Sequence, residues 1–263
     1  MDKLKNVKLF LFDMDGTLYL GDRLFDFTKE LLCRIKQSGG KYMFMTNNSS
    51  KSVVDYIKKL ERLGISTEYD DFITSSQATA YYLKKHHNGA KLYVCGTASL
   101  KAELEGNGFA VTENLDEVDL IVMGFDTELT FKKLEDVSRL LLTRDIPYIA
   151  TNPDLVCPTE FGFVPDCGSV CDMLYNATGK RPVFIGKPEA LMPQLAMEKT
   201  GIDRTQTAVI GDRIYTDVKS GVNAGAVSVL VLSGEATLDD LKTSDVTPDL
   251  CLENCGVIID QIK

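Results

Sequence analysis

Two aspartates, Asp13 and Asp15, stand two residues apart directly after an apolar run near the start of the chain. The run, residues 7–12, predicts a buried strand whose carboxyl end would hold both carboxylates in one place. Ligands of an open parallel sheet bind at that end of its strands. Because neighbouring carboxylates repel each other unless a cation or a shared proton neutralises them, the pattern predicts a metal-assisted or acid/base site.

The chemistry that suits such a pair is nucleophilic attack combined with general acid and base catalysis. One carboxylate can attack phosphorus to give an acyl phosphate, which splits one difficult step into two easier ones. The second can protonate the leaving alcohol and then deprotonate the water that hydrolyses the intermediate. Magnesium would hold the anionic nucleophile and the anionic phosphate together, and its preference for oxygen ligands suits Asp13, a backbone carbonyl, Asp212 and water.

The spacing Asp-x-Asp-Gly also occurs in calcium-binding loops. A loop of the EF-hand type that began at Asp13 would need an acidic ligand at its twelfth position, which is Leu24 in this chain. It would also need a helix before it, where the sequence predicts a strand. We therefore favour the catalytic interpretation of Asp13 and Asp15 over calcium binding.

Two further strand ends carry groups that can bind phosphate. Residues 41–45 predict a strand followed by Thr46 and Asn47, and residues 182–185 predict a strand that runs into Lys187. The Thr46 hydroxyl and the Asn47 amide could donate to a phosphoryl oxygen, and Lys187 could supply a fixed positive charge. Taken singly, a polar residue at the end of a strand is commonplace, and a lysine before a helix is ordinarily a surface cation.

A fourth strand end carries two more carboxylates. Residues 207–210 predict a strand that runs into Asp212, with Asp217 shortly after it. Both could be solvated residues at the start of a helix, where the macrodipole favours negative charge. Beside a metal ion, Asp212 would instead be a ligand and Asp217 an acid just outside the ligands. Four strand ends with complementary chemistry favour one shared site.

The elements that must position these residues follow an α/β pattern. Short apolar runs alternate with segments of helical periodicity, which predicts an α/β fold with a parallel sheet. None of the four polar strand ends falls within residues 79–180, although this stretch has strand and helix patterns of its own. We therefore predict a core made of residues 1–78 and 181–263, with residues 79–180 inserted as a second domain. One large sheet that contains every strand is the alternative.

The individual elements follow from the periodicity of the apolar residues. In the core, helices are predicted at residues 28–38, 51–63, 188–201 and about 212–223, and further strands at 72–74 and 227–232. In the insertion, strands are predicted at residues 91–95, 119–123 and 147–150, and helices at 131–141 and 168–178.

Composition and charge limit the class of protein. The chain has 263 residues, of which 44% are hydrophobic and 25% charged, as is ordinary for a globular protein. Its net charge of −9 opposes binding to nucleic acid or to an anionic membrane, and no basic stretch offers an exception. The first apolar run contains Lys8 and ends at Asp13, so it is too short for a signal peptide or a membrane span.

The seven cysteines are odd in number and scattered, which predicts reduced thiols in a cytoplasmic protein. Cys167 with Cys171, and Cys251 with Cys255, could be metal pairs, but zinc sites favour tighter spacing. The sequence contains no P-loop motif and no dinucleotide-binding glycine motif after the first strand, which argues against both nucleotide-binding folds. Its two histidines are adjacent, so a serine triad has few candidate bases.

The combined motifs resemble those of the haloacid dehalogenase superfamily. The four family motifs match, in order, residues 13–17, Thr46, Lys187, and Gly211-Asp212 with Asp217. The segments at residues 46–50 and 211–217 are similar to those of the branch that contains NagD and the p-nitrophenyl phosphatases. In that branch an α/β cap domain is inserted into a Rossmann-like core between the second and third motifs, which agrees with the predicted insertion.

The resemblance implies a magnesium-dependent phosphatase that acts on a small phosphorylated metabolite, such as a sugar phosphate or a nucleoside monophosphate. It implies that Asp13 is the nucleophile and a metal ligand, and that Asp15 is the acid/base and binds the metal through its carbonyl. It implies phosphate binding by Thr46, Asn47 and Lys187. It implies that Asp212 and Asp217 hold the metal site. The cap supplies the contacts that choose the substrate, and candidates there are Asn152, Asp154 and residues 165–172, which could equally be turn and helix-capping residues. The sequence leaves homo-oligomerisation open.

Three other functions share parts of this chemistry. A phospho-accepting signalling domain also uses aspartate and magnesium, but it needs neither Asp15 nor an inserted domain. Hydrolysis of a carbon–halogen bond uses the same kind of nucleophile, but a halide leaving group needs no proton and no metal, which would leave Asp15 and Asp212 without a role. Transfer of the phosphoryl group to a second substrate instead of water is a further alternative.

Overall fold

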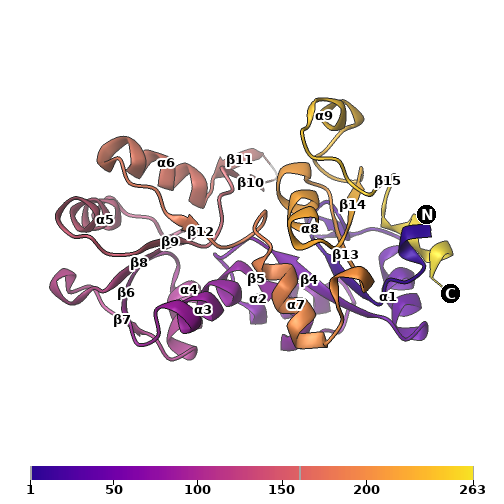
Figure 1. The fold of residues 1–263 in the computed structure, drawn as a ribbon, viewed down its shortest axis with the longest axis horizontal. Helices are drawn as coiled ribbons and strands as arrows, with labels where there is room; N and C mark the ends of the chain where they lie inside the picture. The colour runs from indigo at the N-terminus through magenta and orange to yellow at the C-terminus, as the bar shows by residue number, and fades with distance from the viewer. Residues whose placement is uncertain (1, 160, 263) are drawn as a thin grey trace. The chain divides into compact units, whose positions relative to one another are not determined.

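The structure is a computed structural model that describes residues 2–159 and 161–262. It has the predicted fold class, an α/β protein with a Rossmann-like parallel-sheet core and an inserted α/β cap domain (Figure 1). Its contacts divide the chain into two compact units. The first unit runs to Thr46, resumes over Ile57–Ile73 and continues from Lys187, and the second comprises Asn47–Tyr56 and Thr74–Gly186.

This division differs from the bounds expected from the sequence at three short segments. Residues 47–56, 74–78 and 181–186 cluster with the second unit, whereas the pattern of polar strand ends had grouped them with the core. The segment after Thr46 makes its hydrogen bonds to residues far along the second unit, and such long-range partners leave no trace in local periodicity.

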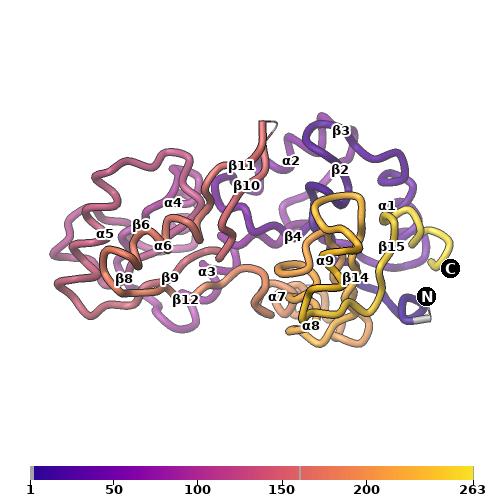
Figure 2. The backbone as a smooth tube through the Cα atoms, turned by 90° about the horizontal axis from the view of Figure 1, so that it is seen from above, coloured from indigo at the N-terminus to yellow at the C-terminus, as the bar shows by residue number. Residues whose placement is uncertain are grey.

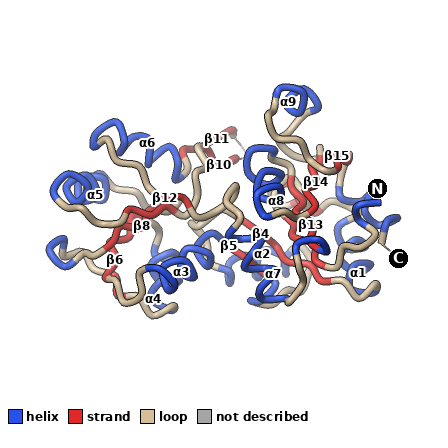
Figure 3. The backbone as a smooth tube through the Cα atoms, in the orientation of Figure 1, coloured by secondary structure: helices blue, strands red, loops and turns tan. Residues whose placement is uncertain are grey.

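The first unit is built on a sheet of six described strands in the order β15-β14-β13-β1-β4-β5. Figure 3 shows the strands of this sheet in red, with β4, β5, β13, β14 and β15 labelled. The strands are β1 (Leu9–Phe12), β4 (Lys41–Thr46), β5 (Phe72–Thr74), β13 (Thr207–Gly211), β14 (Val227–Val231) and β15 (Leu250–Leu252). β1 pairs in parallel with both β4 and β13, and parallel pairing continues through β14 to β15. β1 therefore lies inside the sheet.

The sequence of β1 explains its central position. All four of its residues are apolar and at most 1% exposed, as expected for a strand that is covered on both faces. Phe12 at its end lies opposite Phe44 of β4 and Ile210 of β13. The carboxyl ends of these three strands are thus level, which brings the residues that end or follow them to one edge of the sheet.

Helices of the first unit pack against this sheet. They are α1 (Thr28–Gln37), α7 (Leu191–Thr200), α8 (Lys219–Ala224) and α9 (Leu238–Thr243), and α2 (Val53–Arg62) ends in this unit. α1 contacts β4 through a face that buries Leu31, Leu32 and Ile35, α7 contacts β1, and α8 contacts β13 and β14. Figure 2 gives a second view of these helices beside their strands.

A small hairpin follows the first aspartates. β2 (Tyr19–Leu20) and β3 (Arg23–Leu24) pair antiparallel and leave a two-residue turn at Gly21 and Asp22. Gly21 has a φ of +59°, the left-handed conformation that such tight turns require and that glycine adopts without strain.

The second unit has its own parallel sheet, in the order β12-β9-β8-β6-β7. Its strands are β6 (Lys91–Cys95), β7 (Ala110–Val111), β8 (Leu120–Met123), β9 (Tyr148–Ala150) and β12 (Val183–Phe184), and its helices are α3 (Ser75–His86), α4 (Ala98–Gly106), α5 (Phe131–Thr143) and α6 (Cys167–Thr178). An antiparallel hairpin of β10 (Val156–Thr159) and β11 (Gly162–Pro165) precedes α6. Side chains of β8, α5 and α6, among them Met123, Val137 and Cys171, share one apolar core.

The strand before Lys187 is a correction to the sequence analysis. Residues 182–185 were expected to continue the first sheet, but β12 pairs with β9 of the second sheet. The reason is packing, because Phe184 lies against the apolar core of the second unit. Lys187 itself begins the part of the chain that returns to the first unit.

Most other predicted elements are confirmed within a few residues. The helix expected over residues 212–223 is interrupted, because a π-helical turn (Ile214–Val218) precedes α8. The helices α3, α4 and α9, the hairpins β2–β3 and β10–β11, and the short strands β7 and β15 were not predicted. For the strands, two to four residues carry too little periodicity to be recognised. Among the described residues, no helix has both the length and the apolar character needed to cross a membrane.

The central position of β1 makes a stability prediction. Leu11 is fully buried, so Leu11→Ala removes apolar contacts and leaves a cavity, and we expect the free energy of unfolding to fall by about 2–5 kcal/mol in urea denaturation. The matched control is Leu238→Ala on α9, where the side chain is 56% exposed and the loss should stay below about 0.5 kcal/mol. Equal losses for the two variants would contradict the placement of β1.

Candidate active site

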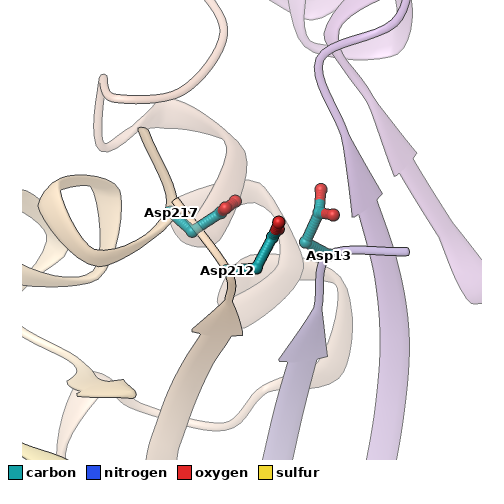
Figure 4. A group of neighbouring side chains, drawn as sticks. All are labelled: Asp13, Asp212 and Asp217. Atoms are coloured by element: carbon teal, nitrogen blue, oxygen red, sulfur yellow. The ribbon is translucent and has the colours of Figure 1, made fainter. Parts of the chain in front are cut away.

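Three aspartates meet at the carboxyl edge of the first sheet (Figure 4). Asp13 follows β1, Asp212 follows the neighbouring strand β13, and Asp217 lies in the π-helical turn just beyond. One carboxylate oxygen from each lies within 4.8 Å of those of the other two. Asp212 and Asp217 are buried and Asp13 is partly buried. We call these three residues the carboxylate cluster.

The ammonium of Lys187 lies against the carboxylate cluster. Its Nζ is 2.6 Å from Asp13 Oδ1 and 2.5 Å from Asp217 Oδ1, and it donates to the Met45 carbonyl at 3.2 Å. Burial by itself lowers the pKa of Lys187, but the charges of Asp13 and Asp217 outweigh that effect and hold the pKa above its ordinary value. Lys187 is therefore a fixed cation.

One ammonium does not balance three carboxylates. Burial raises the pKa of Asp13 to about 8, with Lys187 opposing the rise and Asp217 and Asp212 adding to it. Burial, together with the charge of Asp217, raises the pKa of Asp212 to about 6. Both shifts mean that ionising the whole cluster is unfavourable without a further positive charge, which a bound cation would supply.

The donor atoms fit a divalent cation. Asp212 Oδ2 accepts the backbone N–H of Glu235 at 2.7 Å, whereas Asp212 Oδ1 is buried and has no hydrogen-bond partner among the described residues. A buried carboxylate oxygen without a partner is costly, and a coordinated ion removes that cost. Carboxylate oxygens are the ligands that Mg²⁺ and Ca²⁺ prefer. Asp13, Asp212 and Asp217 are thus the residues that could hold a metal.

Glycines make room for the carboxylate cluster. A Cβ at Gly211, the last residue of β13, would lie 2.3 Å from the Asp217 carboxyl carbon. A Cβ at Gly16 would lie 2.4 Å from Asp212 Oδ2, and Gly16 also has a φ of +83°. Any larger residue at either position would displace a carboxylate, which gives the glycines beside Asp15 and Asp212 a steric role.

Asp15 stands apart from the carboxylate cluster. Its side chain is 47% exposed, with Oδ2 3.9 Å from the Lys59 ammonium and Oδ1 3.4 Å from the Gly21 N–H. Lys59 also lies 4.0 Å from the centre of the Tyr19 ring. The carboxyl group of Asp15 is thus accessible to solvent.

Thr46 and Asn47 fall on the two sides of the boundary between the units. Thr46 ends β4 in the first unit and is buried. Asn47 begins the second unit, where its side-chain amide donates to Asp154 Oδ1 at 3.0 Å and its carbonyl accepts from Asn152 Nδ2 at 2.9 Å. Their binding of phosphate stays a prediction.

Asn152 and Asp154 were candidates for contacts that choose the substrate. Both are buried, and Asn152 Oδ1 accepts the backbone N–H of Asp154 at 3.0 Å while both side chains bond to Asn47. These bonds explain why polar residues are buried at both positions, because they hold the segment that follows β4. Residues 165–172 cover the end of β11 and the start of α6, where Asp166 caps the helix by accepting the Cys167 N–H at 2.5 Å.

A loop that the sequence did not mark as part of the site contacts the carboxylate cluster. The loop of Ser233, Gly234 and Glu235 lies against Asp212, and the Glu235 carboxylate binds the Arg213 and Tyr215 side chains. Nothing in its local sequence marks it as functional. The only signal was indirect, since Arg213 and Tyr215 belong to the segment that matches the fourth family motif.

Comparison with known proteins identifies the family to which the chain belongs. Residues 10–110 match the sequence profile of haloacid dehalogenase-like hydrolases, and residues 184–256 match a second profile described as HAD-hydrolase-like. The chain therefore belongs to the haloacid dehalogenase-like hydrolase family, as the motifs implied.

Relatives that match over nearly the whole chain indicate the enzyme class within this family. The chain is 31% identical over 260 residues to an acid sugar phosphatase of Staphylococcus epidermidis, across 99% of this chain and 100% of the relative. A 4-nitrophenylphosphatase from Thermotoga maritima is 38% identical, with a TM-score of 0.94 over 99% of each chain. NagD of E. coli K-12 is 28% identical, with a TM-score of 0.86 over 95% of this chain and 97% of NagD. The branch and the enzyme class, a phosphatase of this family, are confirmed.

The raised pKa values predict how stability changes with pH when no metal is bound. Between the ordinary carboxyl value of 3.8 and about 8, folded Asp13 holds a proton that the unfolded chain has released, and Asp212 does so up to about 6. The contribution of these two groups to the free energy of unfolding therefore falls as pH rises through this window. We expect Tm in EDTA to drop less between about pH 5 and pH 8 in Asp13→Asn than in the unmodified protein; equal drops would contradict the raised pKa of Asp13.

Proposed function

We propose that this phosphatase hydrolyses small phosphomonoesters, of the sugar phosphate or nucleoside monophosphate type, through an aspartyl-phosphate intermediate and with Mg²⁺ as its cofactor. The observation that carries the proposal is the carboxylate cluster with the Lys187 ammonium bound to two of its members. It unites a nucleophile, anionic metal ligands and a fixed cation at one edge of the sheet. The acid sugar phosphatase and 4-nitrophenylphosphatase relatives support a small phosphoester as the substrate.

Asp13 is the nucleophile in this proposal. Lys187 binds Asp13 Oδ1 at 2.6 Å, which fixes the carboxylate and leaves Oδ2 to attack phosphorus. The attack forms an Asp13–phosphate bond and breaks the bond between phosphorus and the leaving oxygen. When bound by Asp13, Asp212, Asp217 and the Asp15 carbonyl, Mg²⁺ would reduce the repulsion between nucleophile and phosphate and stabilise charge on the phosphoryl oxygens.

Asp15 is the general acid and base. Its exposed carboxyl would give a proton to the leaving alcohol as the Asp13 acyl phosphate forms. The resulting carboxylate would then take a proton from water, which attacks phosphorus, releases inorganic phosphate and restores Asp13. The Gly21 N–H at 3.4 Å and the Lys59 ammonium at 3.9 Å hold the Asp15 carboxyl between these steps.

The proposal also assigns residues to phosphate binding and to substrate choice. Thr46 and Asn47 would donate to the phosphoryl oxygens, and Lys187 would neutralise part of their charge. Residues 79–180 would act as the cap whose contacts select the leaving group, and a panel of phosphorylated metabolites would identify it. The seven cysteines are all thiols, which supports a cytoplasmic location.

The first test removes the nucleophile. Asp13→Asn keeps the shape of the side chain but cannot form the acyl phosphate, so we expect turnover of p-nitrophenyl phosphate to fall at least about 10³-fold. Circular dichroism should show an unchanged fold. Asp22→Asn in the β2–β3 turn, an exposed position, is the control and should keep full activity. An Asp13→Asn variant as active as the control would refute the assigned nucleophile.

The second test removes the metal. We expect EDTA followed by dialysis to stop turnover of p-nitrophenyl phosphate, because the carboxylates then repel the phosphate, and added Mg²⁺ to restore it. The concentration of Mg²⁺ needed for half of the maximal rate should rise about 10-fold or more in Asp212→Asn, which lacks one ligand charge. Full activity in metal-free buffer would show that the cluster works without a cation.

A further inference from the structure

Glu235 makes an unusual set of contacts around the segment that follows Asp212. Its carboxylate Oε2 accepts from Arg213 Nε at 2.8 Å, and its Oε1 accepts from the Tyr215 hydroxyl at 2.8 Å. Both donors belong to the π-helical turn and its first flanking residue, which connect Asp212 to Asp217. The side chain of Glu235 thus ties its own loop to that connection.

The backbone of the same loop holds Asp212 itself. The Glu235 N–H donates to Asp212 Oδ2 at 2.7 Å, and the next N–H, of Ala236, donates to the Asp212 carbonyl at 3.1 Å. The main chain of Glu235 therefore binds Asp212, while its side chain binds Arg213 and Tyr215. The contacts form a closed ring that runs from Asp212 through Arg213 and Glu235 back to Asp212.

The loop approaches Asp212 so closely that only glycine fits beside it. A Cβ at Gly234 would lie 2.0 Å from Asp212 Oδ2. On its other side, Ser233 Oγ donates to the Gly16 carbonyl at 2.7 Å, which anchors the loop to the turn that follows Asp13 and Asp15. The loop is therefore held at both ends of its contact with Asp212.

The result is an asymmetric carboxylate. Asp212 Oδ2 is committed to the Glu235 N–H, while Oδ1 is buried and unpartnered among the described residues. Rotation of the carboxyl group would break the bond at Oδ2, so the ring leaves Oδ1 as the buried Asp212 oxygen that can coordinate a cation. Orientation of a ligand by its hydrogen-bonded surroundings raises metal affinity without a further ligand.

We propose that Glu235 is a positioning residue for the metal site: by bonding to Arg213 and Tyr215 it holds its loop so that Asp212 Oδ1 is presented to a divalent cation. This role rests on the proposed magnesium dependence and adds a residue to it. Glu235 touches neither the metal nor the substrate. Its effect should therefore appear in the affinity for Mg²⁺ and not in the rate of the metal-saturated enzyme.

The test measures Mg²⁺ binding directly, by isothermal titration calorimetry of the metal-free protein. In Glu235→Gln the ion pair with Arg213 is lost, and in Gly234→Ala the new methyl group presses on Asp212 Oδ2 without any change of charge. We expect each variant to bind Mg²⁺ about 10-fold more weakly than the unmodified protein. Turnover of p-nitrophenyl phosphate by Glu235→Gln should return to within about twofold of normal at saturating Mg²⁺.

Matched controls separate positioning from general effects of charge or backbone stiffness. Glu253→Gln removes the same charge at an exposed position, and Gly106→Ala adds a methyl group on α4 where nothing lies within 4 Å. Both should bind Mg²⁺ normally. Unmodified affinity in Glu235→Gln and Gly234→Ala would overturn the positioning role while leaving the magnesium dependence in place. An unmodified protein that bound no Mg²⁺ would overturn the metal dependence itself, and the positioning role with it.

Discussion

The central constraint on the site is that three carboxylates, two buried and one partly buried, lie beside a single ammonium. Lys187 bonds to Asp13 and Asp217, yet the group keeps an excess of negative charge that burial makes expensive, as the raised pKa values of Asp13 and Asp212 record. Replacing such a cluster by apolar residues would favour stability in many proteins. The charge excess therefore fits the proposed metal site, and the surrounding fold supplies the stability to tolerate it.

The fold tolerates this cluster because its supports are rigid and well packed. β1 is buried on both faces between β4 and β13, so the positions of Asp13 and Asp212 follow from the strand register and not from flexible loops. Gly16 and Gly211 remove the side chains that would collide with the carboxylates. The loop at Gly234 and Glu235 then binds one oxygen of Asp212 and leaves the other buried without a hydrogen-bond partner among the described residues. Strand packing, the absence of glycine side chains and hydrogen bonding thus together position the carboxylates of the cluster.

The segment after β4 shows how one polar motif can serve two units. Thr46 ends a strand of the first sheet, and the next residue, Asn47, is bound by Asn152 and Asp154 of the second unit. Buried polar groups of this kind must find partners, and these three satisfy one another. Asn47, one of the residues expected to bind phosphate, is therefore held by hydrogen bonds within the second unit.

The sequence by itself determined the α/β class, most long elements and the identities of the central residues. These follow from local signals, because apolar runs predict strands and the residues after them must stand at the sheet edge. Only the tertiary structure decided that β12 joins the second sheet, that Asn152 and Asp154 bind Asn47, and that Glu235 reaches Asp212. Each of these depends on contacts between residues far apart in the chain, for which periodicity and local spacing carry no information.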